Sequence, residues 1–170
     1  YSELGEMLFT HFGVSGPLVL SASSRIADDP AGARLTIDLK PGLDIDELDR
    51  RLVRDFQQNS RKSFQNALDG LFPRRMIPVM VQLSGIAADT ETNSVTREQR
   101  HAFAALIKCV PITVKAAMPI DQAIITRGGI NVKEIDPSTM ESKLVSGLYF
   151  AGEVIDVDAY TGGFNIQIAC

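Results

Sequence analysis

Residues 44–56 read DIDELDRRLVRDF, and this stretch decides the most regular part of the fold. Its apolar residues recur every three or four positions, which places them on one face of a helix: Ile45, Leu48, Leu52 and Phe56. Asp44, with Glu47 three positions later, predicts a capping box at the start. The stretch therefore predicts an amphipathic helix that packs its apolar face against other elements.

Further helices are predicted on both sides of this one. The spacing predicts a second amphipathic helix over 97–108, with Thr96 as its cap and Gln99 completing a capping box. Residues 71–83 predict two short helical pieces, because Pro78 removes a backbone hydrogen bond and would kink a longer helix. Nearer the start, Pro17 suits the first turn of a helix that ends near residue 28, and Ser15 is its candidate N-cap.

Strand patterns precede and follow these helices. Leu35, Ile37 and Leu39 alternate with polar residues, which predicts a half-buried strand. After Cys109, strands are expected over 110–114, 123–126, 130–133 and 148–151, the last of them buried. The order predicts an α+β fold: an inserted domain of strands and a helical cluster, followed by part of an α/β sheet.

Length and composition bound the class of protein. The chain has 170 residues, of which 45% are apolar and 22% are charged, as in ordinary soluble domains. Its 17 Lys and Arg and 21 Asp and Glu give a formal charge of −4, which argues against a general nucleic-acid binder. No apolar run is long enough for a membrane span and no leader pattern opens the chain, so a cytoplasmic location is expected. The start without Met and the apolar end at residues 164–169 suggest a piece of a longer protein.

Residues for acid–base or metal chemistry are few. His11 lies in a loop before a helix, and His101 is expected on the solvated face of the 97–108 helix. The two histidines have no neighbouring Cys pair, so no metal site is predicted. Cys109 is interpreted as a small core residue, and no Gly-x-Ser-x-Gly motif supports a hydrolase.

Glycines carry the more informative signals. Gly128-Gly129 and Gly162-Gly163 could bring backbone N–H groups close to an anionic ligand, although glycine pairs also serve simply as turns. Gly152-Glu153 follows the predicted buried strand 148–151, where an open parallel sheet can present a carboxylate to a ligand.

Several motifs together resemble one family. They are EMLFTHFGVSGP at 6–17, TRGGI at 126–130, TMESK at 139–143, GLYFAGEVIDVD at 147–158 and TGGFN at 161–165. Together and in this order they resemble the BaiN/YhiN-type family of NAD(P)/FAD-dependent oxidoreductases, which includes aminoacetone oxidases.

The resemblance implies a flavoprotein whose FAD-binding, Rossmann-like domain is split by an inserted domain with β-barrel-like strands. In that arrangement, residues 1–125 are the inserted domain, with helices over about 44–108, and residues 126–170 return into the FAD-binding domain. The family's Gly-x-Gly-x-x-Gly segment has no counterpart here, so the chain alone is expected to lack flavin and activity.

The resemblance also implies a set of cofactor-binding residues on the return segment: Gly128, Gly129, Gly152, Glu153, Asp156, Gly162, Gly163, Phe164 and Asn165. It places the loop with His11 and Ser15 on the substrate side and leaves the catalytic residues unassigned, because hydride transfer is the cofactor's own chemistry.

The function that follows is an FAD-dependent oxidoreductase, either linked to NAD(P)H or of oxidase type, acting on a small organic substrate. The partners expected are that small molecule and neither nucleic acid nor membrane, with the oligomeric state left open. The alternative is a stand-alone α+β interaction or regulatory module whose glycines are only turns. A nucleotide-binding module without redox chemistry rests on the glycine pairs alone.

Overall fold

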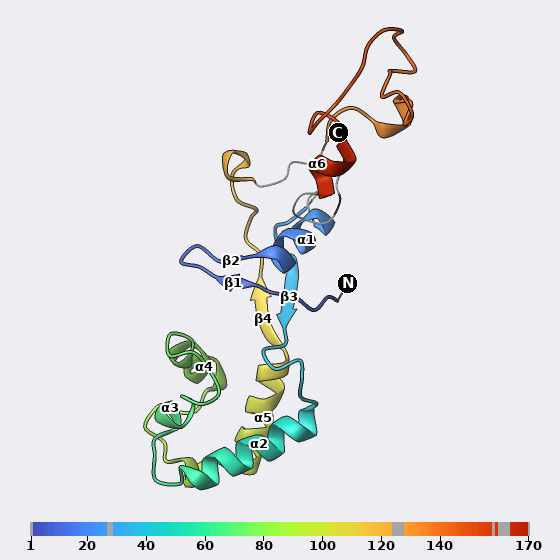
Figure 1. The fold of residues 1–170 in the computed structure, drawn as a ribbon. Coiled ribbons are helices and arrows are strands. Elements are labelled where there is room, and N and C mark those ends of the chain that lie inside the picture. The colour runs from blue at the N-terminus through green and yellow to red at the C-terminus, as the bar shows by residue number, and fades with distance from the viewer. Residues whose placement is uncertain (1, 27–28, 124–127, 158, 160–163, 170) are drawn as a thin grey trace. The chain divides into compact units, whose positions relative to one another are not determined.

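The structure, a computed structural model, describes residues 2–26, 29–123, 128–157, 159 and 164–169 (Figure 1). The chain forms two compact units. We call Arg34–Thr113 the helical unit, and Tyr1–Ala33 with Val114–Cys170 the terminal unit. The domain boundary expected near residue 125 lies outside the described residues and stays a prediction.

The helical unit begins and ends with paired strands. β3 (Arg34–Ile37) lies antiparallel to β4 (Val110–Thr113), with Ile37 opposite Val110. This confirms the predicted strands at 35–39 and 110–114 in shorter form. The pairing closes the unit, because it joins the two points where the chain enters and leaves.

Four helices lie between these strands: α2 (Ile45–Gln58), α3 (Phe64–Ala67), α4 (Ile77–Ser84) and α5 (Arg97–Lys108). A 3₁₀ turn, η1 (Thr92–Ser94), precedes α5. Both predicted capping boxes are present. The Asp44 carboxylate accepts a hydrogen bond from the Glu47 N–H at 2.7 Å, and the Thr96 hydroxyl accepts one from the Gln99 N–H at 3.2 Å.

Apolar side chains from all four helices form one core. Leu48, Leu52 and Phe103 are buried, and the ring of Phe64 meets that of Phe103 edge to face at 5.1 Å. Ile45 was predicted on the same face but is 44% exposed, because it occupies the first helical position, ahead of the turns that pack.

Two sequence predictions in this unit are wrong. Pro78 does not kink a helix but lies in the first turn of α4, where the missing N–H has no helical partner in any case. Cys109 is exposed rather than part of the core. It is the C-cap residue of α5, with φ −143° and ψ 60°, in the connection between that helix and β4.

The terminal unit has little regular structure. β1 (Leu8–Phe9) and β2 (Val14–Ser15) form an antiparallel hairpin that leads into α1 (Pro17–Arg25). Pro17 begins that helix as predicted, but its N-cap is Gly16, because Ser15 is paired with Leu8 in the hairpin. The segment after Val114 contains η2 (Ile120–Gln122), η3 (Val132–Glu134) and α6 (Phe164–Ala169).

The later strand predictions do not hold for the described residues. Residues 130–133 form one bridge at Ile130 followed by a 3₁₀ turn, and 148–151 form one antiparallel bridge between Tyr149 and Glu141. Leu148 and Tyr149 are 42% and 59% exposed, so this segment is not a buried strand. A buried strand is hydrogen-bonded to neighbouring strands and covered by other elements. The single bridge at Tyr149 provides neither the continuous hydrogen bonds nor the covering side chains. Of residues 123–126, all but Ala123 lie outside the described part.

The α+β fold class is confirmed. Among the described residues, the strands form two separate two-stranded antiparallel sheets and no closed barrel. No helix in that part of the chain is both long and apolar enough to cross a membrane.

Candidate functional site

The structure brings four of the predicted cofactor-binding residues together: Gly128, Gly129, Gly152 and Asp156. We call these four the glycine-turn cluster. They are joined by a parallel bridge between Ile130 and Ile155. The Ile130 N–H donates to the Val154 carbonyl at 2.9 Å, and the Asp156 N–H donates to the Ile130 carbonyl at 2.9 Å. Segments 26 residues apart in the chain therefore meet at this point.

Asp156 holds the first glycine turn. Its Oδ1 accepts a hydrogen bond from the Gly128 N–H at 3.0 Å. That carboxylate therefore positions the glycine pair through one oxygen. Its second oxygen retains the capacity to accept a hydrogen bond from a ligand hydroxyl.

Gly129 is required for the bridge itself. Its φ is +138°, and a Cβ at this position would lie 2.4 Å from the Val154 carbonyl oxygen. No side chain fits at that separation. The second glycine of the pair therefore lets residues 129 and 154 approach each other.

Gly128 and Gly152 differ from Gly129 in their surroundings. Both have left-handed backbones, with φ +100° and +84°, and among the described residues no atom beyond the chain neighbours lies within 4 Å of the position where a Cβ would be. Glu153, next to Gly152, is exposed. These positions leave backbone and a carboxylate accessible, which suits a ligand that carries hydroxyl groups.

The last predicted segment is described only in part. Gly162 and Gly163 lie outside the described residues, as does the side chain of Phe164, which begins α6. Asn165 is buried, and its side chain bonds Ala159 twice: its Oδ1 accepts from the Ala159 N–H at 2.8 Å and its Nδ2 donates to the Ala159 carbonyl at 3.2 Å. In this structure Asn165 therefore links α6 to Ala159.

The motif at 139–143 lies in the connection between the two segments of the glycine-turn cluster, Gly128-Gly129 and residues 152–156, and its side chains form local hydrogen bonds there. A Glu141 carboxylate oxygen accepts from the Gly147 N–H at 2.7 Å, and the Ser142 hydroxyl accepts from the N–H groups of Leu144 and Val145, each at 3.1 Å. Met140, which precedes Glu141, has φ +62°, which is uncommon for a residue with a side chain. Nothing in the sequence indicated this positive φ, because Met has no preference for the left-handed conformation.

The two substrate-side candidates lie on the β1–β2 hairpin. Thr10 closes its turn: its hydroxyl donates to the Gly13 carbonyl and accepts from the Gly13 N–H, both at 3.1 Å. His11 is exposed at this turn with its ring 5.0 Å from that of Phe12, whereas Ser15 is half-buried in β2. Among the described residues, no hydrogen bond or ring contact joins either residue to the glycine-turn cluster.

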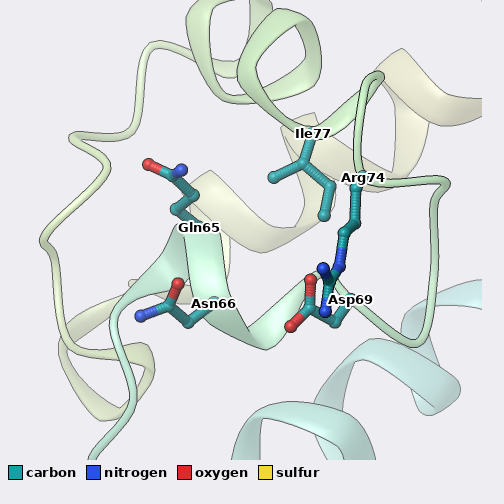
Figure 2. A pocket seen from close by; sticks show the side chains of 5 residues that line it. All are labelled: Gln65, Asn66, Asp69, Arg74 and Ile77. Carbon is teal, nitrogen blue, oxygen red and sulfur yellow. The ribbon is translucent and has the colours of Figure 1, made fainter.

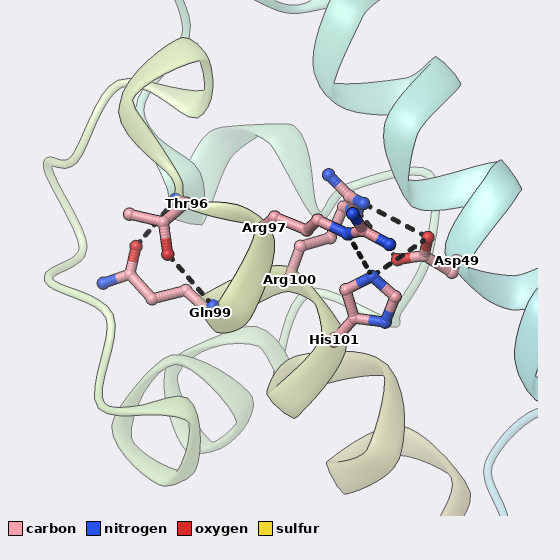
Figure 3. A network of polar contacts seen from close by, with 6 residues as sticks. All are labelled: Asp49, Thr96, Arg97, Gln99, Arg100 and His101. Carbon is pink, nitrogen blue, oxygen red and sulfur yellow. Dashed lines mark hydrogen bonds and ion pairs between the residues drawn. The ribbon is translucent and has the colours of Figure 1, made fainter.

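The second histidine belongs to a polar network on the helical unit (Figure 3). Arg100 of α5 donates to both carboxylate oxygens of Asp49 on α2, at 2.7 and 3.2 Å. His101 lies 3.8 Å from the same carboxylate and accepts a hydrogen bond from Arg97. The hydrogen bond from Arg100 holds the pKa of Asp49 below its ordinary value. This network joins two helices, and the sequence did not indicate it, because its members lie about 50 positions apart.

These observations fit a dinucleotide cofactor such as FAD at the glycine-turn cluster. The open backbones of Gly128 and Gly152 allow close approach, and the carboxylates of Glu153 and Asp156 can accept hydrogen bonds from ribityl or ribose hydroxyls. Among the described residues, no group of three or more His, Cys, Asp or Glu could hold a metal ion.

Comparison with known proteins identifies the family. Residues 1–125 match the family model described as HI0933-like protein barrel and H2TH domain. The chain therefore belongs to the HI0933-like flavoprotein family, which confirms the resemblance to the BaiN/YhiN type.

Three relatives extend over nearly the whole chain. The 3-dehydro-bile acid delta(4,6)-reductase of Clostridium scindens is 28% identical over 98% of this chain and 42% of its own length. The ribosomal RNA dihydrouridine synthases of Haemophilus influenzae and Escherichia coli are each 31% identical, over 99% and 96% of this chain. Those alignments cover 40% and 39% of the two synthases. The chain thus spans about two fifths of the length of these curated relatives.

Proposed function

We propose that the protein containing this chain is an FAD-dependent oxidoreductase that takes electrons from NAD(P)H. The observation that carries the proposal is the family match, together with a relative named as a reductase. The glycine-turn cluster supports it, because left-handed glycines and two carboxylates lie on the segment that resembles the return into a split FAD-binding domain.

The names of the relatives suggest one reaction type. A delta(4,6)-reductase of a 3-dehydro-bile acid and a dihydrouridine synthase both add hydrogen across a carbon–carbon double bond conjugated to a carbonyl group. We extend this reaction type to the present protein. Each turnover consumes one NAD(P)H and one proton. The hydride ends on the carbon distal to the carbonyl, the proton on the carbon beside it, and NAD(P)⁺ is released.

Bound at this segment, FAD would supply the hydride chemistry that links the nicotinamide to the substrate. The chain's own residues bind and orient. Asp156 holds the Gly128 turn, and Glu153 presents a second carboxylate beside Gly152. His11 and Ser15 remain the substrate-side candidates, because an imidazole and a hydroxyl can both hydrogen-bond to a substrate. The same relatives leave two substrate classes, a free small molecule and an RNA.

The test uses the full-length protein. Its visible absorption spectrum is expected to show bound flavin, which NADH or NADPH bleaches without oxygen and which a conjugated enone then restores. A colourless protein that cannot be reconstituted with FAD overturns the proposal. Restoration by oxygen but by no enone or uridine-containing RNA would identify an oxidase and overturn the reductase assignment.

A further inference from the structure

Met140 is the one residue other than glycine, among those the structure describes, whose backbone has a positive φ. Its φ of +62° is left-handed, a conformation that strains a residue with a Cβ. A strained residue persists only where its surroundings hold it in place, and such residues are concentrated at functional sites. The contacts that hold Met140 therefore indicate what its conformation is for.

Backbone hydrogen bonds hold Met140 on both sides. Its N–H donates to the Asp136 carbonyl at 2.7 Å, and its own carbonyl accepts from the Phe150 N–H at 3.0 Å. The Asp136 N–H in turn donates to the Glu141 carbonyl at 2.8 Å. Residues 136–141 therefore form a closed turn, and Met140 is the residue through which this turn binds Phe150.

The half-buried Glu141 holds the same returning segment. One of its carboxylate oxygens accepts from the Gly147 N–H at 2.7 Å, and its backbone forms an antiparallel bridge with Tyr149. The Ser142 N–H adds a hydrogen bond to the Leu148 carbonyl at 2.7 Å. The segment 147–150 is therefore bound to residues 140–142 along its whole length.

The turn Gly152-Glu153 lies between two held points. Before it, Phe150 is held by the bond to the Met140 carbonyl. After it, the Val154 carbonyl accepts from an N–H of the other segment of the glycine-turn cluster, at 2.9 Å. The exposed carboxylate of Glu153 therefore keeps its position only while both points are held.

We propose that Met140 and Glu141 are positioning residues for FAD, which hold the turn Gly152-Glu153 in the conformation that the cofactor binds. They act through the backbone of residues 147–150 and not by contact with the cofactor. A turn that is fixed beforehand binds more tightly, because a site that is populated only part of the time loses affinity in proportion. The inference rests on the proposed function, from which it takes FAD as the ligand.

Two variants of Met140 in the full-length protein test the backbone conformation. Met140→Val introduces a β-branched residue, which strongly disfavours a left-handed φ, whereas Met140→Asn introduces a residue that adopts it more readily. The Kd for FAD is measured from the quenching of flavin fluorescence when FAD is titrated with flavin-depleted protein. Met140→Val is expected to bind FAD about tenfold or more weakly, and Met140→Asn is expected to stay within about threefold of the unmodified protein.

Variants of Glu141 test the carboxylate. Glu141→Ala removes the acceptor of the Gly147 N–H, and Glu141→Gln restores an acceptor without the charge. The matched control is Asp69→Ala, because Asp69 is an exposed acid beside a hollow of the helical unit (Figure 2) and has no ion pair among the described residues. Glu141→Ala is expected to bind FAD about fivefold or more weakly, and the other two within about twofold.

Hydrogen exchange and thermal unfolding, both without flavin, accompany each titration. The Phe150 N–H is expected to exchange faster in Met140→Val than in Met140→Asn, while the unfolding temperature of the helical unit is the same in both.

Three results would overturn the inference. The first is unchanged FAD affinity in Met140→Val, and the second is equal loss in Met140→Val and Met140→Asn, which would assign the role to the thioether side chain. The third is equal loss in Glu141→Ala and Asp69→Ala, which would reflect net charge alone. Each of these results with a yellow unmodified protein refutes only this inference. An unmodified protein that is colourless and cannot be reconstituted with FAD refutes the proposed function and this inference with it.

Discussion

At the residue scale, two adjacent glycines have different reasons for being glycine. Both have a left-handed φ, but only Gly129 approaches another backbone, since its missing Cβ would lie 2.4 Å from the Val154 oxygen. A Cβ on Gly128 would meet no other described residue within 4 Å apart from its chain neighbours, and the Gly128 N–H donates to Asp156. A side chain at Gly128 would therefore cause backbone strain alone, whereas a side chain at Gly129 would also clash with the backbone of Val154.

Gly129→Ala is expected to break the bridge between residues 130 and 155, whereas Gly128→Ala adds only the backbone strain of about 1–2 kcal/mol that a left-handed residue costs. In the full-length protein, Gly129→Ala should therefore lose most of its bound FAD and Gly128→Ala much less. Flavin absorbance per mole of protein, with thermal unfolding alongside, checks this. Equal flavin content in the two variants would contradict the role given to Gly129.

The Asp49 carboxylate allows a prediction about pH. Its pKa in the folded state is lowered, chiefly by the hydrogen bond from Arg100, so it stabilises the fold above the ordinary Asp pKa. This contribution is lost as the pH falls from that value through the folded-state pKa. Asp49→Asn should cost about 1 kcal/mol at neutral pH, as expected for a partly exposed charge-assisted pair.

Urea unfolding between about pH 5 and about pH 2.5 tests the sign, because Asp49→Asn should flatten the decline of unfolding free energy that the unmodified protein shows there. Asp89→Asn is the control, since Asp89 is exposed and has no ion pair among the described residues. A pH profile for Asp49→Asn that parallels the unmodified one would contradict the prediction.

At the scale of elements, helix packing distinguishes leucines that look alike in the sequence. Leu52 of α2 is fully buried in the core of the helical unit, whereas Leu83 of α4 is 46% exposed. Leu52→Ala is expected to lower the free energy of unfolding by about 2–5 kcal/mol, because it leaves a cavity.

Leu83→Ala makes the same chemical change at the exposed position and should cost less than about 1 kcal/mol. Denaturant unfolding of both variants, followed by helical circular dichroism, gives the comparison. Similar losses at the two positions would mean that the exposed face of α4 is covered in solution.

At the scale of the whole molecule, the two units are built differently. The described buried apolar residues lie almost entirely in the helical unit, and the terminal unit contributes only Ile135 and Ile155 to that set. Stability should therefore be distributed unequally along the chain.

Hydrogen exchange of this chain without flavin is expected to be slowest in α2 and α5 and clearly faster over residues 148–157. The reason is that the second segment has exposed backbone and only isolated bridges. Slower exchange at 148–157 than in α2 would contradict this view and would indicate packing that the isolated bridges do not provide.

Local patterns were sufficient for the helices and their ends. The spacing of Leu48, Leu52 and Phe56 predicted α2, and the pairs Asp44–Glu47 and Thr96–Gln99 predicted both capping boxes. These features depend on residues three or four positions apart, so the chain specifies them before any tertiary contact forms. The motifs also identified the family, which the match over residues 1–125 confirms.

Tertiary structure alone decided what depends on distant residues. Only the folded chain shows the hydrogen bonds between Gly128 and Asp156 and between Arg100 and Asp49. It also shows that Cys109 is exposed and that most of residues 148–151 are exposed. The apolar run at 148–151 illustrates the limit: its composition is that of a buried strand, but burial depends on neighbouring strands. A sequence determines its periodicities and caps, whereas burial and long-range pairing depend on which surfaces come together in space.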